Sequence, residues 1–173
     1  MRIPAYGIEM HPISHDELDD VLNVYRQCED FLALGPVPTA SMDMVEKDVE
    51  LSRSQGGIFC GICNGDGEMI GVLDFVPGGY EGDASHAFLE LLMIAAPFRS
   101  RGIGQAVVEA LESETRKDPS VRTISAGVQA NNPQAIKFWQ RNGYRIVSGP
   151  QRMPDQTIAY GLRKDLDRGR QEH

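Results

Sequence analysis

The residues best suited to chemistry join a buried apolar segment to a helical one, over residues 94–105. This connection contains Gly102 and Gly104, preceded by Arg99 and Arg101. Glycine adopts backbone conformations that are closed to other residues, and it lets the main chain approach a ligand closely. The first N–H groups of the following helix lack partners inside it, and together with the helix dipole they attract anionic oxygens. The segment therefore predicts a phosphate-binding turn.

Two familiar phosphate motifs do not fit this turn. A P-loop ends in Gly-Lys-Ser or Gly-Lys-Thr, and the chain contains no such triplet. A dinucleotide-binding GxGxxG motif matches Gly102 and Gly104 but requires glycine where Val107 stands. On its own, the turn is also compatible with a tight strand-to-helix connection that binds no ligand.

Two motifs in the chain resemble those of the GNAT N-acetyltransferases. The pattern Arg99-x-x-Gly102-x-Gly104 is similar to the Arg/Gln-x-x-Gly-x-Gly/Ala motif of that family. Residues 128–144 resemble a later family motif, in which Asn, Ala, an aromatic pair and Gly-Phe or Gly-Tyr recur. The two motifs follow the family's order and spacing, and the resemblance spans residues 8–162.

The resemblance implies that acetyl-CoA binds as the acyl-donor co-substrate. In the family the glycine turn holds the pyrophosphate through main-chain N–H groups, and the end of the preceding strand pairs with the pantetheine amides. The N–H of Ile94 stands where the family polarises the thioester carbonyl, so it would stabilise a developing oxyanion. Asn132 matches a CoA-contacting Asn. The residues to which cofactor binding is carried over are Leu92, Met93, Ile94, Arg99, Ser100, Arg101, Gly102, Ile103, Gly104, Gln105 and Asn132.

Glu90 is the candidate general base that would take a proton from an amine acceptor. It is the only charged residue in the run 87–96, where burial tends to raise the pKa of a carboxyl group. Period-two counting places its side chain on the same strand face as that of Ile94. A structural role is an equal alternative, with Glu90 pairing an Arg or capping a backbone group. Asp74 and His86 are the reserve candidates.

Trp139 departs from the family pattern. Many members have a Tyr at this position, which protonates the leaving thiolate, whereas an indole donates a hydrogen bond but is not a general acid. We therefore expect Trp139 to pack its helix onto the sheet, and Tyr144 to lie in the core as well. The thiolate would leave without an enzymic acid, because a thiol is already fairly acidic. The substitution also favours an alternative function, a non-catalytic CoA-binding or sensory module.

The elements that must position these residues follow from the apolar spacing. Strands are predicted over 8–13, 58–63, 69–76, 87–95, 123–128, 145–147 and 157–162, and helices begin near residues 14, 41, 104 and 133. The run 87–95 is typical of a central strand buried on both faces. The order βααβββαβαββ predicts an α/β (α+β) fold, a central mixed and mostly antiparallel sheet flanked by helices. One domain would cover 1–165, with a disordered tail over 166–173.

Composition narrows the class of function. The 173 residues carry a net charge of −8 with no extended basic patch, which excludes a typical nucleic-acid binder and leans towards cationic or neutral substrates. The chain shows no apolar run long enough for a membrane span and no signal peptide, so we expect a cytoplasmic protein. Cys60 and Cys63 form a CxxC pattern, but in a predicted strand they face opposite ways, so no metal site is expected.

The main hypothesis is direct transfer of an acetyl group to a primary amine, of a small molecule or of a peptide or protein, in a ternary complex. The acceptor would contact the first two helices, the 78–85 loop and the 149–156 hairpin. Asp16, Asp19, Glu29 and Asp30 could attract a cation there, although such acids more often form a solvated face. A homodimer through a sheet edge or the last strands is compatible with the pattern.

Overall fold

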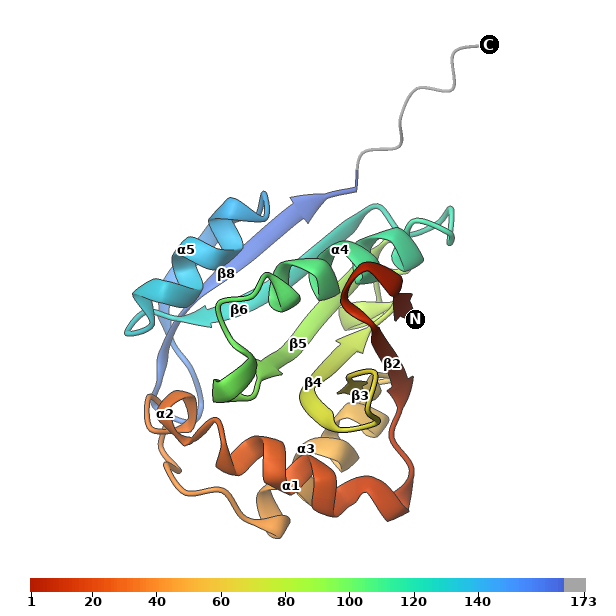
Figure 1. Cartoon of the computed structure of the whole chain (residues 1–173). Helices are drawn as coiled ribbons and strands as arrows, with labels where there is room; N and C mark the ends of the chain where they lie inside the picture. The colour runs from red at the N-terminus through yellow and green to blue at the C-terminus, as the bar shows by residue number, and fades with distance from the viewer. Residues whose placement is uncertain (167–173) are drawn as a thin grey trace.

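A computed structural model describes residues 1–166 as one eight-stranded sheet flanked by helices (Figure 1). The strand order is β1-β2-β3-β4-β5-β6-β8-β7. All neighbouring strands are antiparallel except β5 and β6, as the predicted mixed sheet requires. The strands are β1 Arg2–Ile3, β2 Ile8–Pro12, β3 Ile58–Cys63, β4 Met69–Val76, β5 His86–Ile94, β6 Thr123–Gln129, β7 Arg145–Arg152 and β8 Ile158–Asp165, and the helices are α1 Leu18–Arg26, α2 Glu29–Leu32, α3 Met42–Ser54, α4 Ile103–Thr115 and α5 Pro133–Arg141.

Helices cover the two faces of the sheet in different groups (Figure 1). On one face α4 and α5 contribute Val107, Leu111 and Trp139 to the larger core cluster. On the other face α1 and α3 contribute Tyr25 and Val45 to a second, separate cluster. The two clusters bury opposite sides of the central strands, because successive strand residues point to opposite faces.

Strand β3 ends in a tight turn, and its two cysteines face opposite ways as predicted. The turn that starts at Asn64 joins β3 to β4, and its Oδ1 accepts hydrogen bonds from the N–H groups of Asp66 and Glu68, both at 3.0 Å. Cys60 packs in the larger cluster and Cys63 against the second one. The two thiols therefore lie on opposite faces of β3, and they do not form one site.

A gap opens between β5 and β6, the two parallel strands. They pair from His86 to Leu89, opposite Thr123 to Ala126, and no further. Beyond that point β5 runs on to Ile94 and β6 to Gln129, and the two strands diverge (Figure 1). This leaves one side of the second half of β5 without a strand partner.

A β-bulge interrupts β5 at the start of this gap. Asp74 of β4 pairs with Leu91, whereas the next residue of β4, Phe75, pairs with Leu89. Glu90 is therefore the extra residue of the bulge. An extra residue breaks the strict alternation of side chains and re-aims the residues around it, and such bulges are frequent near active sites.

The structure differs from the sequence prediction at its edges. It adds the two-residue strand β1 and the one-turn helix α2, and it extends β7 and β8 beyond their predicted ends. The predicted tail began at residue 166, but Leu166 is only 6% exposed and its N–H donates to the carbonyl of Arg122. The rest of that tail, 167–173, lies outside the described residues.

Candidate active site

The predicted phosphate turn presents a row of free main-chain donors. Within residues 1–166, the N–H groups of Ser100, Arg101, Gly102, Ile103, Gly104 and Gln105 donate to no acceptor. Ser100 and Gly102 both adopt left-handed backbone conformations, with φ of 61° and 79°. Alternating conformations of this kind gather successive N–H groups into an anion-binding concavity. Because the row ends at the positive end of helix α4, the turn is suited to hold negatively charged oxygens.

The two glycines of the turn serve different needs. A Cβ atom on Gly102 would lie 2.8 Å from the hydroxyl of Tyr6, and its φ is one that side chains rarely adopt. A Cβ on Gly104 would lie 3.3 Å from the ring of Phe138 in α5. Gly102 is therefore required by the turn itself, and Gly104 by the close packing of α4 on α5.

The two arginines of the turn also differ. The Nε of Arg99 donates to the carbonyl oxygen of Ile94 at 2.8 Å, and its terminal nitrogens donate to Asp30 at 2.5 and 3.0 Å. The Arg99 side chain, predicted at the rim of the phosphate site, is thus committed within the protein. Arg101 instead lies over the ring of Phe98, 5.7 Å from its centroid, and forms no ion pair within the described chain.

The open side of β5 offers main-chain groups of alternate residues. The N–H of Ala95 donates to the carbonyl of Ile70 in β4 at 2.8 Å. Since antiparallel pairs alternate between bonded and non-bonded, the main chain of Met93 also faces β4, and that of Leu92 and Ile94 faces the gap. Of the three predicted pantetheine contacts, Met93 is therefore turned away, whereas Leu92 and Ile94 are available.

Asn132 caps the N-terminus of helix α5 with the oxygen of its side-chain amide, and the nitrogen of that amide is left over. Its Oδ1 accepts from the N–H of Ala135 at 3.1 Å, which caps the helix. The side-chain nitrogen has no partner among residues 1–166 and remains a possible donor to a ligand. The predicted cofactor contact at this position therefore has to use that nitrogen.

Glu90 lies with two other carboxyl groups, Asp48 of α3 and Asp74 of β4, which we call the carboxylate face. The expectation that Glu90 shares a face with Ile94 is wrong. The bulge shifts the alternation, and Glu90 is placed within the electrostatic influence of Asp74 and Asp48 on the α3 side. Glu90 is exposed, in contrast to the burial expected for this run. Desolvation by its surroundings, reinforced by those two negative charges, still raises the pKa of its carboxyl above the ordinary value.

Asp74 is the most buried member of the carboxylate face, at 4% exposure. Burial raises its pKa to about 6, although the hydroxyl of Ser52, which donates to its Oδ1 at 2.6 Å, acts in the opposite direction. Asp48 accepts from the hydroxyl of Tyr25 at 2.7 Å, and burial raises its pKa as well. The sequence prediction missed Tyr25 and Asp48, because a pair on two separate helices leaves no local motif.

No cation neutralises these acids within the described part of the chain. The ion pairs there involve other carboxyl groups, so Asp48, Asp74 and Glu90 are unpaired with Lys, Arg or His. Unpaired carboxyl groups that are partly desolvated attract a positive ligand or hold a proton. The arrangement is therefore suited to receive a proton or to bind a cationic amine.

The second reserve base, His86, lies at the start of β5. Its Nε2 is 2.6 Å from the hydroxyl of Ser125 in β6, and its ring makes an edge contact with Tyr80 at 5.5 Å. Tyr80 in turn stacks on Phe88 at 4.2 Å. These contacts hold His86 where β5 and β6 are still paired, before the gap opens.

The predictions for the two large aromatic residues are confirmed. Trp139 is 7% exposed and Tyr144 is 2% exposed, and their rings meet edge to face at 4.9 Å in the larger core cluster. The hydroxyl of Tyr144 is buried near Glu112, and burial raises its pKa. Neither residue is placed to protonate a leaving thiolate.

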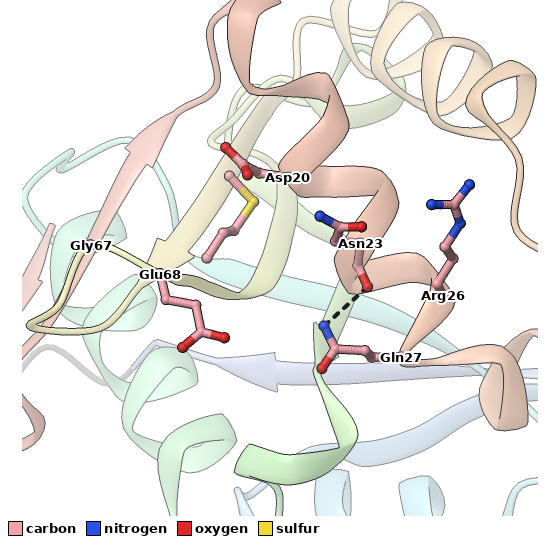
Figure 2. A pocket seen from close by; sticks show the side chains of 7 residues that line it. Asp20, Asn23, Arg26, Gln27, Gly67 and Glu68 are labelled. Carbon is pink, nitrogen blue, oxygen red and sulfur yellow. Dashed lines mark hydrogen bonds between the residues drawn. The ribbon is translucent and has the colours of Figure 1, made fainter.

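One hollow lies near the diverging end of β6, and another lies away from the gap. The first, of about 590 Å³, is bounded by the segment after α2, the end of β6 and the β7–β8 hairpin; its lining residues are Leu34, Gly35, Pro36, Ala130, Asn131, Asp155, Gln156, Thr157 and Ile158. The second, of about 310 Å³, lies between α1 and the β3–β4 turn (Figure 2). It contains none of the predicted site residues. Each hollow is lined by one of the segments predicted to contact an acceptor, the first by the 149–156 hairpin and the second by the first helix.

Residues 1–166 contain no helix long and apolar enough to cross a membrane. Within the same range, no group of three or more His, Cys, Asp or Glu side chains is placed to hold a metal ion.

Comparisons with known proteins agree on one family. A model described as the acetyltransferase (GNAT) family matches residues 18–144. An acetyltransferase from Thermus thermophilus is 23% identical, with a TM-score of 0.76 over 92% of this chain and 97% of that one. Spermidine N-acetyltransferase from Vibrio cholerae, in complex with CoA and spermine, is 10% identical, with a TM-score of 0.71 over 92% and 96%.

A third similar structure is the PaiA N-acetyltransferase from Thermoplasma acidophilum in complex with coenzyme A. It is 16% identical, with a TM-score of 0.65 over 91% of this chain and 98% of that one. At such identities these structures establish a shared fold. No curated protein sequence matches the chain.

Proposed function

The chain belongs to the acetyltransferase (GNAT) family, and on that premise we propose how its residues divide the work of an acetyl-CoA-dependent N-acetyltransferase. The reaction moves an acetyl group from acetyl-CoA to an amine. The observation that carries the proposal is the row of six unpartnered N–H groups, residues 100–105, next to the open side of β5. A phosphate-bearing thioester with an amide-containing arm is complementary to both.

In this proposal the donor is held chiefly by main chain. The N–H groups of residues 100–105 bind the pyrophosphate, and the exposed Arg101 adds positive charge beside them. Leu92 offers its main-chain groups to the pantetheine amides in the gap, and Ile94 offers its N–H to the acyl end of the donor. Asn132 contributes its side-chain nitrogen. The backbone of Arg99 is less suited, because its N–H already donates to the carbonyl of Ala96 at 3.3 Å.

The chemical step we propose is direct attack in a ternary complex. The amine nitrogen attacks the thioester carbonyl, a C–N bond forms, and the C–S bond breaks. The N–H of Ile94 stabilises the developing oxyanion, and Glu90 takes the proton that the amine loses. Because Trp139 and Tyr144 are buried, the thiolate leaves unassisted and is protonated by solvent.

The acceptor we propose is a primary amine of a small molecule or of a peptide or protein. Two features support it. The carboxylate face has no internal cation among the described residues, so it favours a positively charged amine over an anion. The hollow of about 590 Å³ has the volume of a small-molecule site and is lined in part by the 149–156 hairpin, one of the segments predicted to contact the acceptor.

The deciding experiment is release of free thiol from acetyl-CoA in the presence of a panel of amines, with calorimetric titration of CoA in parallel. Thiol release that depends on one class of amine supports the transferase. The alternative, a non-catalytic CoA-binding or sensory module, predicts tight CoA binding with no turnover on any amine. Failure to bind CoA would contradict both.

We further propose a homodimer in the cytoplasm. Strand β7 forms one edge of the sheet and is exposed along its whole length, with Ile146 and Val147 41% and 46% exposed. An exposed edge strand with apolar side chains favours pairing with a second chain. The three cysteines are free thiols, as is usual in a reducing compartment. Sedimentation of the protein with and without a β7 substitution, Val147→Lys, tests the dimer.

A further inference from the structure

Arg99 makes three hydrogen bonds with the described residues, one from each nitrogen of its guanidinium, and together they fix the direction in which the group points. Two go to the carboxylate of Asp30 in α2 as a bidentate pair, and the third goes to the main-chain oxygen of Ile94. Bidentate pairs between a guanidinium and a carboxylate are among the stronger and more directional contacts in proteins. The Arg99 guanidinium, in turn, holds the pKa of Asp30 below its usual range, so the pair stays ionised at neutral pH.

The segment that contains Asp30 is hydrogen-bonded to residues on both sides of the gap between β5 and β6. On the β5 side, the carbonyl of Gln27 accepts from the N–H of Ala96 at 3.3 Å, and the thiol of Cys28 lies 3.5 Å from the oxygen of Ile94. On the β6 side, the side-chain nitrogen of Asn131 donates to the carbonyl of Leu34 at 3.1 Å. Residues 27–34, which include α2, therefore form a strap across the open ends of β5 and β6 (Figure 1).

We propose that Arg99 is a positioning residue of the acetyl transfer, which holds the strap, residues 27–34, against the end of β5 and does not bind the phosphates of CoA. The strap ends at Leu34, and the chain continues into Gly35 and Pro36. These three residues form one wall of the hollow of about 590 Å³. Arg99 belongs to the motif proposed to bind the donor. Through the strap it would also set the position of the wall that faces the acceptor.

The bond to Ile94 extends this role to the donor strand. A carbonyl oxygen has two lone pairs, and that of Ile94 already faces the Nε of Arg99 and the thiol of Cys28. The oxygen is therefore not free for a ligand, whereas the N–H of Ile94 is. Arg99 fixes the orientation of the strand end at which the proposed oxyanion donor lies.

The test compares Arg99→Lys and Asp30→Asn with Arg101→Ala, a loop arginine that makes no ion pair with the described residues. Lysine cannot form the bidentate pair, and the asparagine of the second variant removes the charge while keeping the shape. We expect each strap variant to lower kcat/KM for the amine by roughly fivefold and to leave the Kd of CoA within about twofold. The double variant should be no worse than either single one.

Arg101→Ala should give the opposite pattern, a roughly fivefold weaker Kd for CoA with a smaller loss of affinity at high salt than the wild type shows. Hydrogen exchange provides a readout that needs no turnover. In both strap variants the amides of residues 27–34 should exchange faster, while the amides of the larger core cluster do not change. A thermal unfolding scan confirms that each variant is folded.

Only the expected change in kcat/KM rests on the proposed acetyl transfer. If the wild-type protein acetylates no amine, that function fails, but hydrogen exchange and CoA titration still decide the role of Arg99. The proposal would be overturned if Arg99→Lys weakened CoA binding as much as Arg101→Ala does. It would equally be overturned if Asp30→Asn left the strap amides unchanged or tightened CoA binding, because a guanidinium released from Asp30 would then be reaching the phosphates.

Discussion

The phosphate turn, residues 99–105, follows the end of β5, whereas the carboxylate face, Asp48, Asp74 and Glu90, surrounds the bulge within that strand. The two regions present different kinds of polar group. The turn offers main-chain N–H groups, and its key requirement is a left-handed backbone at Gly102. The carboxylate face offers side chains from α3, β4 and β5, and its key requirement is the bulge at Glu90.

The two regions are therefore not equally predictable from the sequence. A main-chain site depends on a short run of residues that are neighbours in sequence, so it leaves a motif. A side-chain site depends on which residues three separate elements bring together, so it leaves none. Substitutions in each region should therefore have separable effects on CoA affinity, turnover and stability.

The largest effect is expected from Gly102→Val. A β-branched residue is strained at a φ of 79°, and its Cβ would lie 2.8 Å from the hydroxyl of Tyr6, so the row of N–H groups would be displaced. We expect CoA affinity to fall by about 1,000-fold, measured by calorimetry. Gly67→Val is the matched control, because Gly67 has a φ of +80° but open space around it. Equal CoA affinity in the two variants would refute the main-chain account of the turn.

Glu90→Gln should give the next largest effect, on the other half of the site. Without a proton acceptor, kcat should fall by about 100-fold while the Kd of CoA stays unchanged. In the wild type the carboxyl must be ionised to act, and its pKa is raised. Activity should therefore rise with pH through a value above the ordinary Glu pKa and then level off, a limb that Glu90→Gln should lack.

The exposed Glu46 of α3 provides a control for Glu90, since Glu46→Gln removes a carboxyl group outside the carboxylate face. A Glu90→Gln variant with full turnover would remove Glu90 from the mechanism. In that case Asp74→Asn becomes the decisive variant for the proton acceptor.

Asp74→Asn should stabilise the protein in neutral solution. The folded-state pKa of about 6 lies above the ordinary value of 3.8, so ionisation of Asp74 disfavours folding. The free energy of unfolding of the wild type should therefore fall as the pH rises from about 4 to about 6, and it should fall no further on this account above that range. The variant should be more stable at pH 8 by on the order of 2 kcal/mol and no more stable at pH 3.5, in urea unfolding. Equal gains at both pH values would contradict the burial of an ionised carboxyl.

The smallest effect is expected from Trp139→Phe. Its loss of packing in the larger cluster should lower the free energy of unfolding by about 1–2 kcal/mol. Because Trp139 is buried against Phe138 and Tyr144, kcat should change by less than about twofold. A large fall in kcat with little loss of stability would place Trp139 at the reacting atoms and would contradict its role in packing.

Most of the fold was predictable from apolar spacing. The glycine turn was predictable from its motif, and the assignment of its neighbours to a donor came from the family resemblance. Long periodic segments such as α3, β4 and α4 were found because their core-facing residues repeat with the period of the element. Helix α2 was missed because its single turn is too short to show a period. The hydrogen-bond partners of Arg99 and the direction of the Met93 main chain were not predictable, since a motif specifies residue types but not hydrogen-bond partners.

Two features could be read from the sequence alone. The glycine turn depends on local conformation, because Gly102 adopts a backbone conformation that other residues rarely take. The packing role of Trp139 depends on simple burial of a large apolar ring. Only the tertiary structure decided the rest. The bulge turned Glu90 towards Asp48 and Asp74, and the strap brought Asp30 to Arg99, 69 residues away. Both results come from the register of strands and the docking of helices, which depend on contacts between segments distant in the chain.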